Sequence, residues 1–265
     1  MVMMKKLFVA WACMFCVELW AMPSVWLYNK ADNLSPLSEN IAEVRPIASL
    51  TKVMTAMVIL DQQSNMMEPL KLKRTVSSRL PPGTYTRQEL LESMIVGSDN
   101  AAAETLAENS IHGRQAFIDS MNKKAQELAM YHTVFDDPSG LSRNNVGTAT
   151  EVGIMITAAH RYSFIKHAST LHQVVINQSA GKKVKHIQVG NTNRNMLHTF
   201  KSITVSKTGF TNPAGFCVGL LVENNGIQYV IVVLGATNKN RRLDIVQKIM
   251  YNYITATNNS TQLVS

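Results

Sequence analysis

The sequence predicts an α/β (α+β) fold in which an antiparallel sheet is flanked by helices and carries a helical subdomain. Segments of strand character lie near both ends of the chain, at 24–29 and within 203–235, and helical periodicity fills the region between them. The apolar runs 215–223 and 227–235 are separated by the turn sequence Glu-Asn-Asn-Gly, which is typical of a hairpin between antiparallel strands.

Each element rests on a local pattern. Residues 24–29 (SVWLYN) are rich in β-branched and aromatic side chains and predict the first strand. Residues 49–63 have a high apolar content and predict a buried helix, and residues 81–83 (PPG) predict a loop. After that loop we expect helices at 87–96, near 101–109 and at 114–130. A further helix is expected to begin at the capping-box pattern of Thr148 and Glu151. Strands are expected at 203–206, 215–223 and 227–235, followed by an amphipathic helix near 240–256.

Residues 1–21 have the pattern of a secretory signal peptide. Lys5 and Lys6 precede an apolar stretch of 15 residues, which is too short to span a membrane comfortably. The sequence therefore predicts export, one domain over 22–257 and a polar tail over 258–265.

Composition narrows the classes of function. With 46% hydrophobic and 17% charged residues in 265, the chain is not broadly disordered. Its net charge of +8 favours an anionic partner, but nothing beyond charge supports binding to nucleic acid. There is no H-E-x-x-H motif and the seven histidines lack metal-site spacing, so we expect no metal and no cofactor. Cys217 lies in an apolar run, where a buried and unreactive thiol is expected.

Three short motifs follow one another along the chain. S-x-x-K occurs four times, S-x-N three times and K-T-G once, at 207–209. Each motif is short enough to occur by chance, so the structural context must separate the copies. A nucleophilic serine needs a base within hydrogen-bond reach on a rigid element.

Only the S-x-x-K copy at Ser49 has that setting. On a helix, residues three apart lie on one face, so Lys52 can reach Ser49. Burial of the helix desolvates Lys52 and lowers its pKa, and a nearby cation is expected to lower it further, which makes a neutral amine base. The copy at Ser120 lies in the middle of a Lys-rich helix, and those at Ser163 and Ser179 are expected in irregular, polar stretches.

The other two motifs are expected at ends of elements. Ser98 to Asn100 falls between two predicted helices, where a loop can aim both side chains into a cleft, although these residue types are also favoured as helix N-caps. Residues 207–209 are expected to end the short strand 203–206. There a cation and a hydroxyl can hold a carboxylate, glycine lets a ligand approach, and an extended peptide can add along the strand.

Longer segments around the motifs carry a family resemblance. Residues 47–56 (IASLTKVMTA), 135–141 (FDDPSGL) and 207–215 (KTGFTNPAG) resemble segments of the low-molecular-mass penicillin-binding proteins. These are serine D-alanyl-D-alanine carboxypeptidases and endopeptidases of bacterial cell walls. The resemblance covers roughly residues 24–256 and implies a β-lactamase/transpeptidase-like fold.

The resemblance implies catalytic roles for five residues. Ser49 would be the nucleophile and Lys52 its general base. Ser98 would pass a proton to the leaving amine, and Asn100 would hold a substrate amide. Lys207 would add positive charge to the site.

It also implies residues that bind the substrate. Thr208 would bind a carboxylate next to Gly209, and the backbone N–H groups of Ser49 and Phe210 would form an oxyanion hole. Arg242, at the start of the last helix, matches a carboxylate-binding arginine of the carboxypeptidases, while a solvated helix arginine is an equally ordinary explanation.

The implied substrate is the stem peptide of peptidoglycan, with β-lactam antibiotics as covalent inhibitors. Only 56 residues follow Gly209, so the chain resembles the single-domain endopeptidases of the penicillin-binding protein 7 type, which cut peptide cross-links. A D-alanyl-D-alanine carboxypeptidase is the alternative. A serine β-lactamase is disfavoured because residues 133–137 hold no Glu-x-x-Asn pattern, which could activate water for rapid deacylation. A non-catalytic wall-binding protein is disfavoured because every motif residue is present. The oligomeric state stays open.

Overall fold

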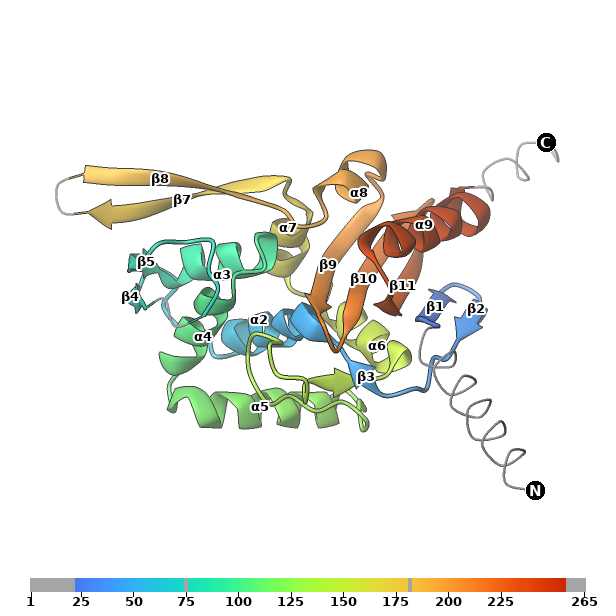
Figure 1. The fold of residues 1–265 in the computed structure, drawn as a ribbon, viewed down its shortest axis with the longest axis horizontal. Coiled ribbons are helices and arrows are strands. Elements are labelled where there is room, and N and C mark those ends of the chain that lie inside the picture. The colour runs from blue at the N-terminus through green and yellow to red at the C-terminus, as the bar shows by residue number, and fades with distance from the viewer. Residues whose placement is uncertain (1–21, 74–75, 181–182, 256–265) are drawn as a thin grey trace, which may run out of the picture.

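The centre of the molecule is a five-stranded antiparallel sheet with the strand order β2-β1-β11-β10-β9 (Figure 1). The computed structural model describes residues 22–73, 76–180 and 183–255. The strands of this sheet are β1 (Ser24–Asn29), β2 (Leu34–Glu39), β9 (Ile203–Thr211), β10 (Gly215–Asn224) and β11 (Ile227–Ala236). β1 pairs with β11, so the first and last strands of the chain are neighbours, and the expected fold class is confirmed.

Both faces of the sheet are covered, which explains the nearly continuous apolar sequence of its central strands. In β11, Ile231 and Val233 belong to one core with residues of α9 (Lys239–Ile249), whereas Val230 and Val232 belong to another with residues of α6 (Ala149–Ala159). The alternation follows from the two-residue period of a strand.

A helical region packs beside the sheet and surrounds one central helix, α2 (Thr51–Asp61). Every residue of α2 from Thr51 to Ile59 is buried, as the apolar content of this segment predicts. The surrounding helices are α3 (Arg87–Val96), α4 (Asn100–Glu108), α5 (Gly113–Glu127) and α7 (Ser163–Thr170).

The molecule has a second sheet, which was not expected from the sequence. It has the strand order β4-β5-β7-β8, and the hairpin of β7 and β8 projects from the body of the molecule (Figure 1). Its strands are β4 (Pro69–Leu72), β5 (Gly83–Thr86), β7 (Gln173–Ala180) and β8 (Lys183–Gly190). The expectation that Ser163 and Ser179 lie in irregular stretches is therefore wrong, because Ser163 begins α7 and Ser179 lies in β7.

Three boundaries differ from expectation. Residues 207–209 do not end a strand, because β9 continues to Thr211, which pairs with Gly215 of β10; this pairing overrides the low strand propensity of lysine and glycine. Gly83 opens β5 rather than completing a loop. The last helix, expected near 240–256, is α9 followed by the π-helical segment η2 (Met250–Thr255).

The capping box also lies elsewhere. Thr148 does cap α6 by accepting from the backbone N–H of Glu151, but the Glu151 carboxylate accepts instead from the backbone N–H of His132. The complete reciprocal box is formed by Thr86 and Glu89 at the start of α3.

Three short elements complete the described chain: β3 (Arg45–Pro46), β6 (Val146–Gly147) and α8 (Arg194–Thr199). Within the described residues, no helix combines the length and the apolar character that a membrane crossing requires. The expected signal peptide, 1–21, and the polar tail, 258–265, lie outside those residues. Cys217 is buried in β10, and burial raises its pKa to about 11, so the thiol is inert as expected.

Candidate active site

Ser49 lies in a tight turn at the entrance to the buried helix. The 3-10 turn η1 (Ala48–Leu50) leads directly into α2, and Ala48 has a φ of 48°, in the left-handed region. One turn later, Lys52 Nζ donates a hydrogen bond to Ser49 Oγ at 3.0 Å. The two side chains therefore meet as their spacing predicts.

Lys52 is fully buried and donates to three acceptors. Besides Ser49, they are Asn100 Oδ1 at 2.6 Å and the backbone carbonyl of Ser139. The amine is thus fixed by groups from three separate parts of the chain. Because these acceptors are neutral, they hold the amine in place without a direct ion pair.

Burial lowers the pKa of Lys52 to about 7. More distant carboxylates oppose this effect and raise the pKa; they belong to Asp137, Asp99 and Glu104. A neighbouring cation, which the sequence analysis invoked, is therefore not the main cause of the low pKa. Near neutral pH a large share of the Lys52 amine is unprotonated and can accept a proton from Ser49.

Asp137 organises the loop that supplies the Ser139 carbonyl. Its carboxylate accepts from Ser139 N and Gly140 N, each at 2.6 Å, and from the backbone N–H of Ser142. Burial raises the pKa of Asp137, but these hydrogen bonds outweigh it, led by that from Ser142, and the net pKa is lowered. Gly140 has a φ of 83°, and a Cβ there would lie 2.0 Å from the carbonyl oxygen of Ala48. The loop thus fits against the Ser49 turn only with glycine at this position.

Ser98 and Asn100 reach the cleft from the start of α4. Asn100 accepts from Lys52 and donates to Ser77 Oγ at 2.6 Å. Ser98 has a φ of 59°, which belongs to a sharp loop between α3 and α4. The residue between them, Asp99, is the N-cap of α4, so the capping explanation holds for Asp99 while its neighbours face the cleft.

Asp99 also ties down the loop on the other side of the cleft. Its buried carboxylate accepts from Ser78 Oγ at 2.9 Å and from Arg79 N at 2.7 Å. These bonds fix residues 77–80 against α4.

Lys207 joins the strand motif to the loop motif. Its Nζ donates to Ser98 Oγ at 2.8 Å, although 109 residues separate the two in sequence. Burial lowers the pKa of Lys207 well below its usual value, and repulsion from Lys52, Arg242 and Arg79 lowers it further. The protonated form of Lys207 is therefore less favoured than that of an exposed lysine, and a carboxylate bound beside it would favour that form.

β9 passes close to the backbone of the Ser49 turn. A Cβ at Gly209 would lie 3.0 Å from Ser49 N and 3.1 Å from the carbonyl oxygen of Ile47. Glycine therefore permits this approach. The next residue, Phe210, is 51% exposed, and its ring packs against Phe216 with centroids 4.2 Å apart, which makes an aromatic wall at the cleft rim.

The carboxylate-binding candidates come from β9 and α9. Thr208 is buried and donates to Thr192 Oγ1 at 2.8 Å. Arg242, in α9, is only 5% exposed, so it is not a solvated helix arginine. Its Nη1 donates to the carbonyl of Cys217 at 3.3 Å.

A cavity of about 420 Å³ brings most of the predicted residues together; those that line it are Ser49, Ser98, Asn100, Thr208, Gly209, Phe210 and Arg242. Lys52 and Lys207 lie beneath them and reach the cavity through hydrogen bonds to Ser49 and Ser98. The sequence analysis missed other lining residues, notably Ser77, Arg79, Thr192 and Lys239. None of them belongs to a recognisable motif.

The arrangement can perform acyl transfer. It holds the Ser49 hydroxyl beside the Lys52 amine and the Ser98 hydroxyl beside the Lys207 amine. Strand β9 passes close to the backbone of Ser49, and a buried guanidinium lies in the same cleft. The copy of S-x-x-K at Ser120 has none of this, since its hydroxyl donates to the carbonyl of Ala116 and the side chain of Lys123 is 79% exposed. The described residues hold no cluster of three or more metal-ligating side chains.

Proteins with similar sequences are named as D-alanyl-D-alanine peptidases. A sequence model of the S11 peptidases, described as D-alanyl-D-alanine carboxypeptidase, matches residues 37–238. A D-alanyl-D-alanine endopeptidase of Pseudomonas aeruginosa is 35% identical over 215 residues, which cover 76% of this chain and 67% of that protein. The match thus spans about two thirds of the relative's length.

Solved structures agree on the fold. The Streptomyces K15 DD-transpeptidase has a TM-score of 0.79 at 23% identity, over 86% of this chain and 95% of that one. Penicillin-binding protein D2 from Listeria monocytogenes, in its ampicillin-bound form, has a TM-score of 0.76 at 26% identity with the same coverage. The transpeptidase-like fold expected from the sequence is confirmed.

Proposed function

Because this chain belongs to the D-alanyl-D-alanine carboxypeptidase family of serine peptidases, we propose that it cuts D-alanyl peptide bonds through an acyl-enzyme on Ser49. The observation that carries the proposal is the contact of 3.0 Å between Ser49 Oγ and the fully buried amine of Lys52. A pKa of about 7 leaves that amine free to take the serine proton.

The first step is attack on the carbonyl of a D-alanine. Ser49 Oγ bonds to the carbonyl carbon while Lys52 Nζ takes its proton. The backbone N–H groups of Ser49 and Phe210 hold the oxygen that becomes negative, and such a donor lowers the barrier by about 3–4 kcal/mol. The close approach of β9 to Ser49 N supports this role.

The second step expels the amine. The bond between the carbonyl carbon and the leaving nitrogen breaks, and Ser98 Oγ gives its proton to that nitrogen. The proton that Lys52 took from Ser49 replaces it on Ser98, which restores the neutral amine of Lys52, while Lys207, 2.8 Å from Ser98 Oγ, orients that hydroxyl. Asn100 holds a substrate amide, and Thr208 and Arg242 bind the carboxylate of the leaving residue. Water then hydrolyses the ester, again with Lys52 as base.

β-Lactams fit the same cleft. A penicillin contains a strained amide and a carboxylate, so Ser49 can open the ring while Thr208 and Arg242 hold the carboxylate. No Glu-x-x-Asn pattern is present to activate water for rapid release. We therefore expect a long-lived adduct.

The preferred bond is the peptide cross-link, so the activity is that of an endopeptidase. The likeness to an endopeptidase at 35% identity supports this choice. Carboxypeptidase activity is the second candidate, and buried Arg242 favours it because a fixed guanidinium suits a terminal carboxylate. Both reactions attack the same carbonyl and differ only in the leaving amine.

A peptidase that cuts peptidoglycan must be exported to reach its substrate. The apolar segment that follows Lys5 and Lys6 supports export to the periplasm, with residues 22–257 as the peptidase domain. The predicted segment 1–21 lies outside the described residues. N-terminal sequencing of the exported protein tests this boundary.

Digestion of purified cross-linked muropeptides, followed by mass analysis, tests the proposed function. We expect dimers to become monomers, penicillin to block the reaction, and Ser49→Ala to abolish it. Ser120→Ala, in the second copy of the motif, is the matched control and should retain activity. Release of free D-alanine from monomeric pentapeptides, with dimers left uncut, would overturn the endopeptidase preference. An absence of any product would support a non-catalytic protein.

A further inference from the structure

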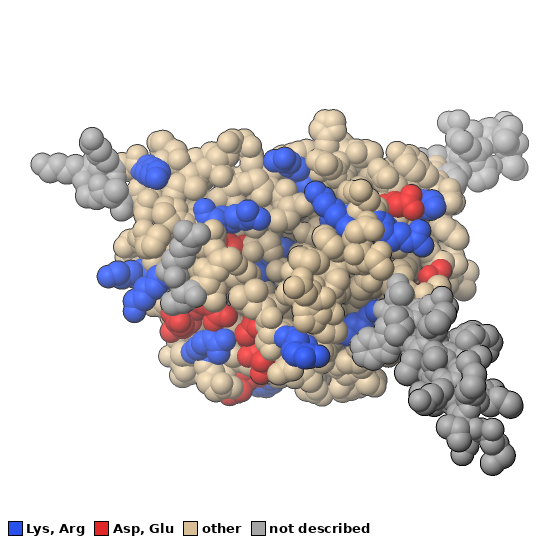
Figure 2. All heavy atoms as spheres, viewed as in Figure 1, with Lys and Arg blue, Asp and Glu red and all other residues tan. Residues whose placement is uncertain are grey.

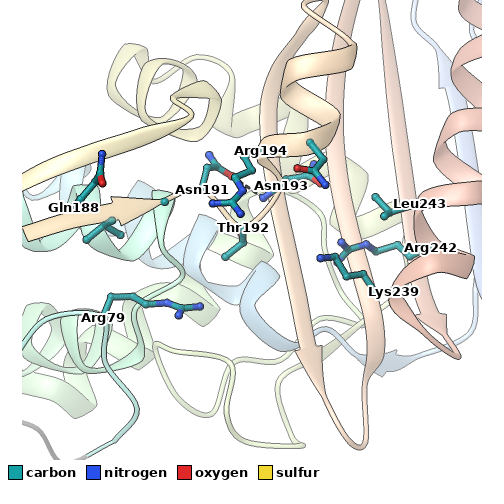
Figure 3. Close-up of a pocket in the computed structure, with 12 residues that line it drawn as sticks. Arg79, Gln188, Asn191, Thr192, Asn193, Arg194, Lys239, Arg242 and Leu243 are labelled. Carbon is teal, nitrogen blue, oxygen red and sulfur yellow. Dashed lines mark hydrogen bonds between the residues drawn. The ribbon is translucent and has the colours of Figure 1, made fainter.

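A second cavity, of about 410 Å³, adjoins the Ser49 cleft. Four cationic side chains line it, and no Asp or Glu does; the four are Arg79, Arg194, Lys239 and Arg242. In Figure 3, Arg79 extends from one side and Lys239 and Arg242 from the other, all toward Thr192. Side-chain amides, among them those of Asn191 and Asn193, complete the lining. The composition of this wall suits an anion that also accepts hydrogen bonds.

The two cavities lie side by side and share part of their lining. Arg79, Thr192, Lys239 and Arg242 line both, whereas Ser49 lines only the first and Arg194 only the second. A ligand that runs from Ser49 past the Thr208–Arg242 side of the cleft therefore enters the second cavity.

The cations of this wall have no carboxylate partner. Among the described residues, none of the four forms a salt bridge; the hydrogen bonds of Arg79 and Arg242 go to the carbonyls of Gly97 and Cys217. Arg242 is 5% exposed, and leaving a buried guanidinium without a counter-charge is costly. In Figure 2, Lys and Arg are spread over the whole of this face, while most visible Asp and Glu gather in its lower part.

We propose that this second cavity, the leaving-strand pocket, binds the terminal carboxylate of the peptide strand that a cross-link cleavage releases. The inference rests on the proposed function, because it takes Thr208 and Arg242 to hold the carboxylate next to the leaving amine. A free D-alanine ends at that carboxylate. The leaving strand of a cross-link continues beyond it and ends in a further carboxylate, which Arg194 and Lys239 are placed to receive.

The pocket therefore selects between the two reactions of the same catalytic centre. It stabilises the transition state of cross-link cleavage, in which the long leaving strand is present, and adds nothing when the leaving group is D-alanine alone. This gives the chain a structural reason to prefer cross-linked peptides.

Paired substrates and charge-removing variants test the pocket. Arg194→Gln changes a side chain that lines only the second cavity, Lys239→Gln changes one that lines both cavities, and Lys201→Gln removes an exposed charge that lines neither. For cross-linked dimer we expect kcat/KM to fall about fivefold in each pocket variant and about twentyfold in the double variant, as expected when hydrogen bonds to a charged group are lost at a partly exposed site. In Arg194→Gln the ratio of dimer cleavage to D-alanine release should fall by the same factor, and Lys201→Gln should leave it unchanged.

A dimer whose leaving strand ends in a carboxamide identifies the group recognised. Wild type should cut it as slowly as the double variant cuts the carboxylate dimer, and the double variant should not distinguish the two dimers. Equal losses for both dimers in the variants would overturn the pocket proposal.

Failure of the proposed function gives a different result. If wild type cuts no dimer but releases D-alanine, the endopeptidase assignment falls and the pocket assignment falls with it. If wild type cuts dimer and the variants match it, only the pocket assignment falls. Penicillin acylation of Ser49, measured in every variant, shows that each variant is folded.

Discussion

Lys207 Nζ lies 2.8 Å from Ser98 Oγ, so the strand motif and the loop motif form one hydrogen-bonded unit across the cleft. The Lys52 amine makes the corresponding link on the other side, from Ser49 to Asn100. Two buried amines thus join three motifs that are far apart in sequence. Each amine is set beside a hydroxyl, which is the arrangement that a proton relay needs.

The Ser98–Lys207 contact predicts non-additive effects on acylation. Ser98→Ala and Lys207→Gln each break the same link, so the double variant should be little slower than the slower single variant. We expect a coupling of about 1–3 kcal/mol in a double-mutant cycle on the penicillin acylation barrier. A cycle of Lys207→Gln with Ser120→Ala is the control and should be additive. Additivity in the first cycle would contradict the relay.

The pKa of Lys52 predicts the pH dependence of acylation. The base must be neutral, so the rate should rise with pH and level off above about 7, where Lys52 loses its proton. Below this value the rate should fall about tenfold per pH unit. Stopped-flow measurement of penicillin acylation between pH 5 and 9 checks the profile.

Because burial is the main cause of this low pKa, Lys207→Gln should slow acylation without moving the midpoint of the profile. A midpoint that shifts by a full pH unit in this variant would show that charge repulsion, not burial, controls Lys52.

Stability should also depend on pH through the buried amine. The folded-state pKa of Lys52 lies below its unfolded value of 10.5, so between about pH 7 and 10.5 the unfolded chain holds one more proton. The free energy of unfolding should therefore rise with pH by about 1.4 kcal/mol per unit from this group. Denaturant titrations at pH 7, 8 and 9 measure the slope, and Lys52→Met should reduce it. An equal slope in Lys52→Met would exclude the buried amine as its source.

Gly140 should tolerate no side chain. Gly140→Ala would place a Cβ 2.0 Å from the carbonyl oxygen of Ala48 at a φ of 83°, so the loop must move away from the Ser49 turn. We expect a loss of about 3 kcal/mol in stability, from strain and overpacking, and a large loss of acylation rate. Gly113→Ala is the control, because its φ of 76° is similar but nothing lies within 4 Å. Equal losses in the two variants would mean that backbone strain alone, not the clash, decides.

Some of this architecture could be predicted from the sequence because it depends on local pattern. The buried helix follows from its apolar content, and the reach of Lys52 to Ser49 follows from helical spacing. The hairpin turn between β10 and β11 follows from its Asn-Gly pair, whose φ values are both positive.

Other parts depend on contacts that no local pattern reveals. The hairpin of β7 and β8 is mostly polar or exposed, and Ile176 and Val189 are the only buried residues among its described side chains, so its periodicity is weak. Ser139 meets Lys52 through a backbone carbonyl, which any residue could supply. Arg79 and Arg194 reach the cavities from a loop and a short helix that only the tertiary fold brings together.

Intact-mass spectrometry after incubation with penicillin tests the central claim most directly, namely that Ser49 is the acylated nucleophile. We expect one added penicilloyl group, located by peptide mapping in the fragment that contains Ser49, and persisting far longer than one peptide turnover. Ser49→Ala should take up none, and Ser120→Ala should react as wild type does. An adduct on another residue, or an unmodified protein that hydrolyses penicillin rapidly, would contradict the account.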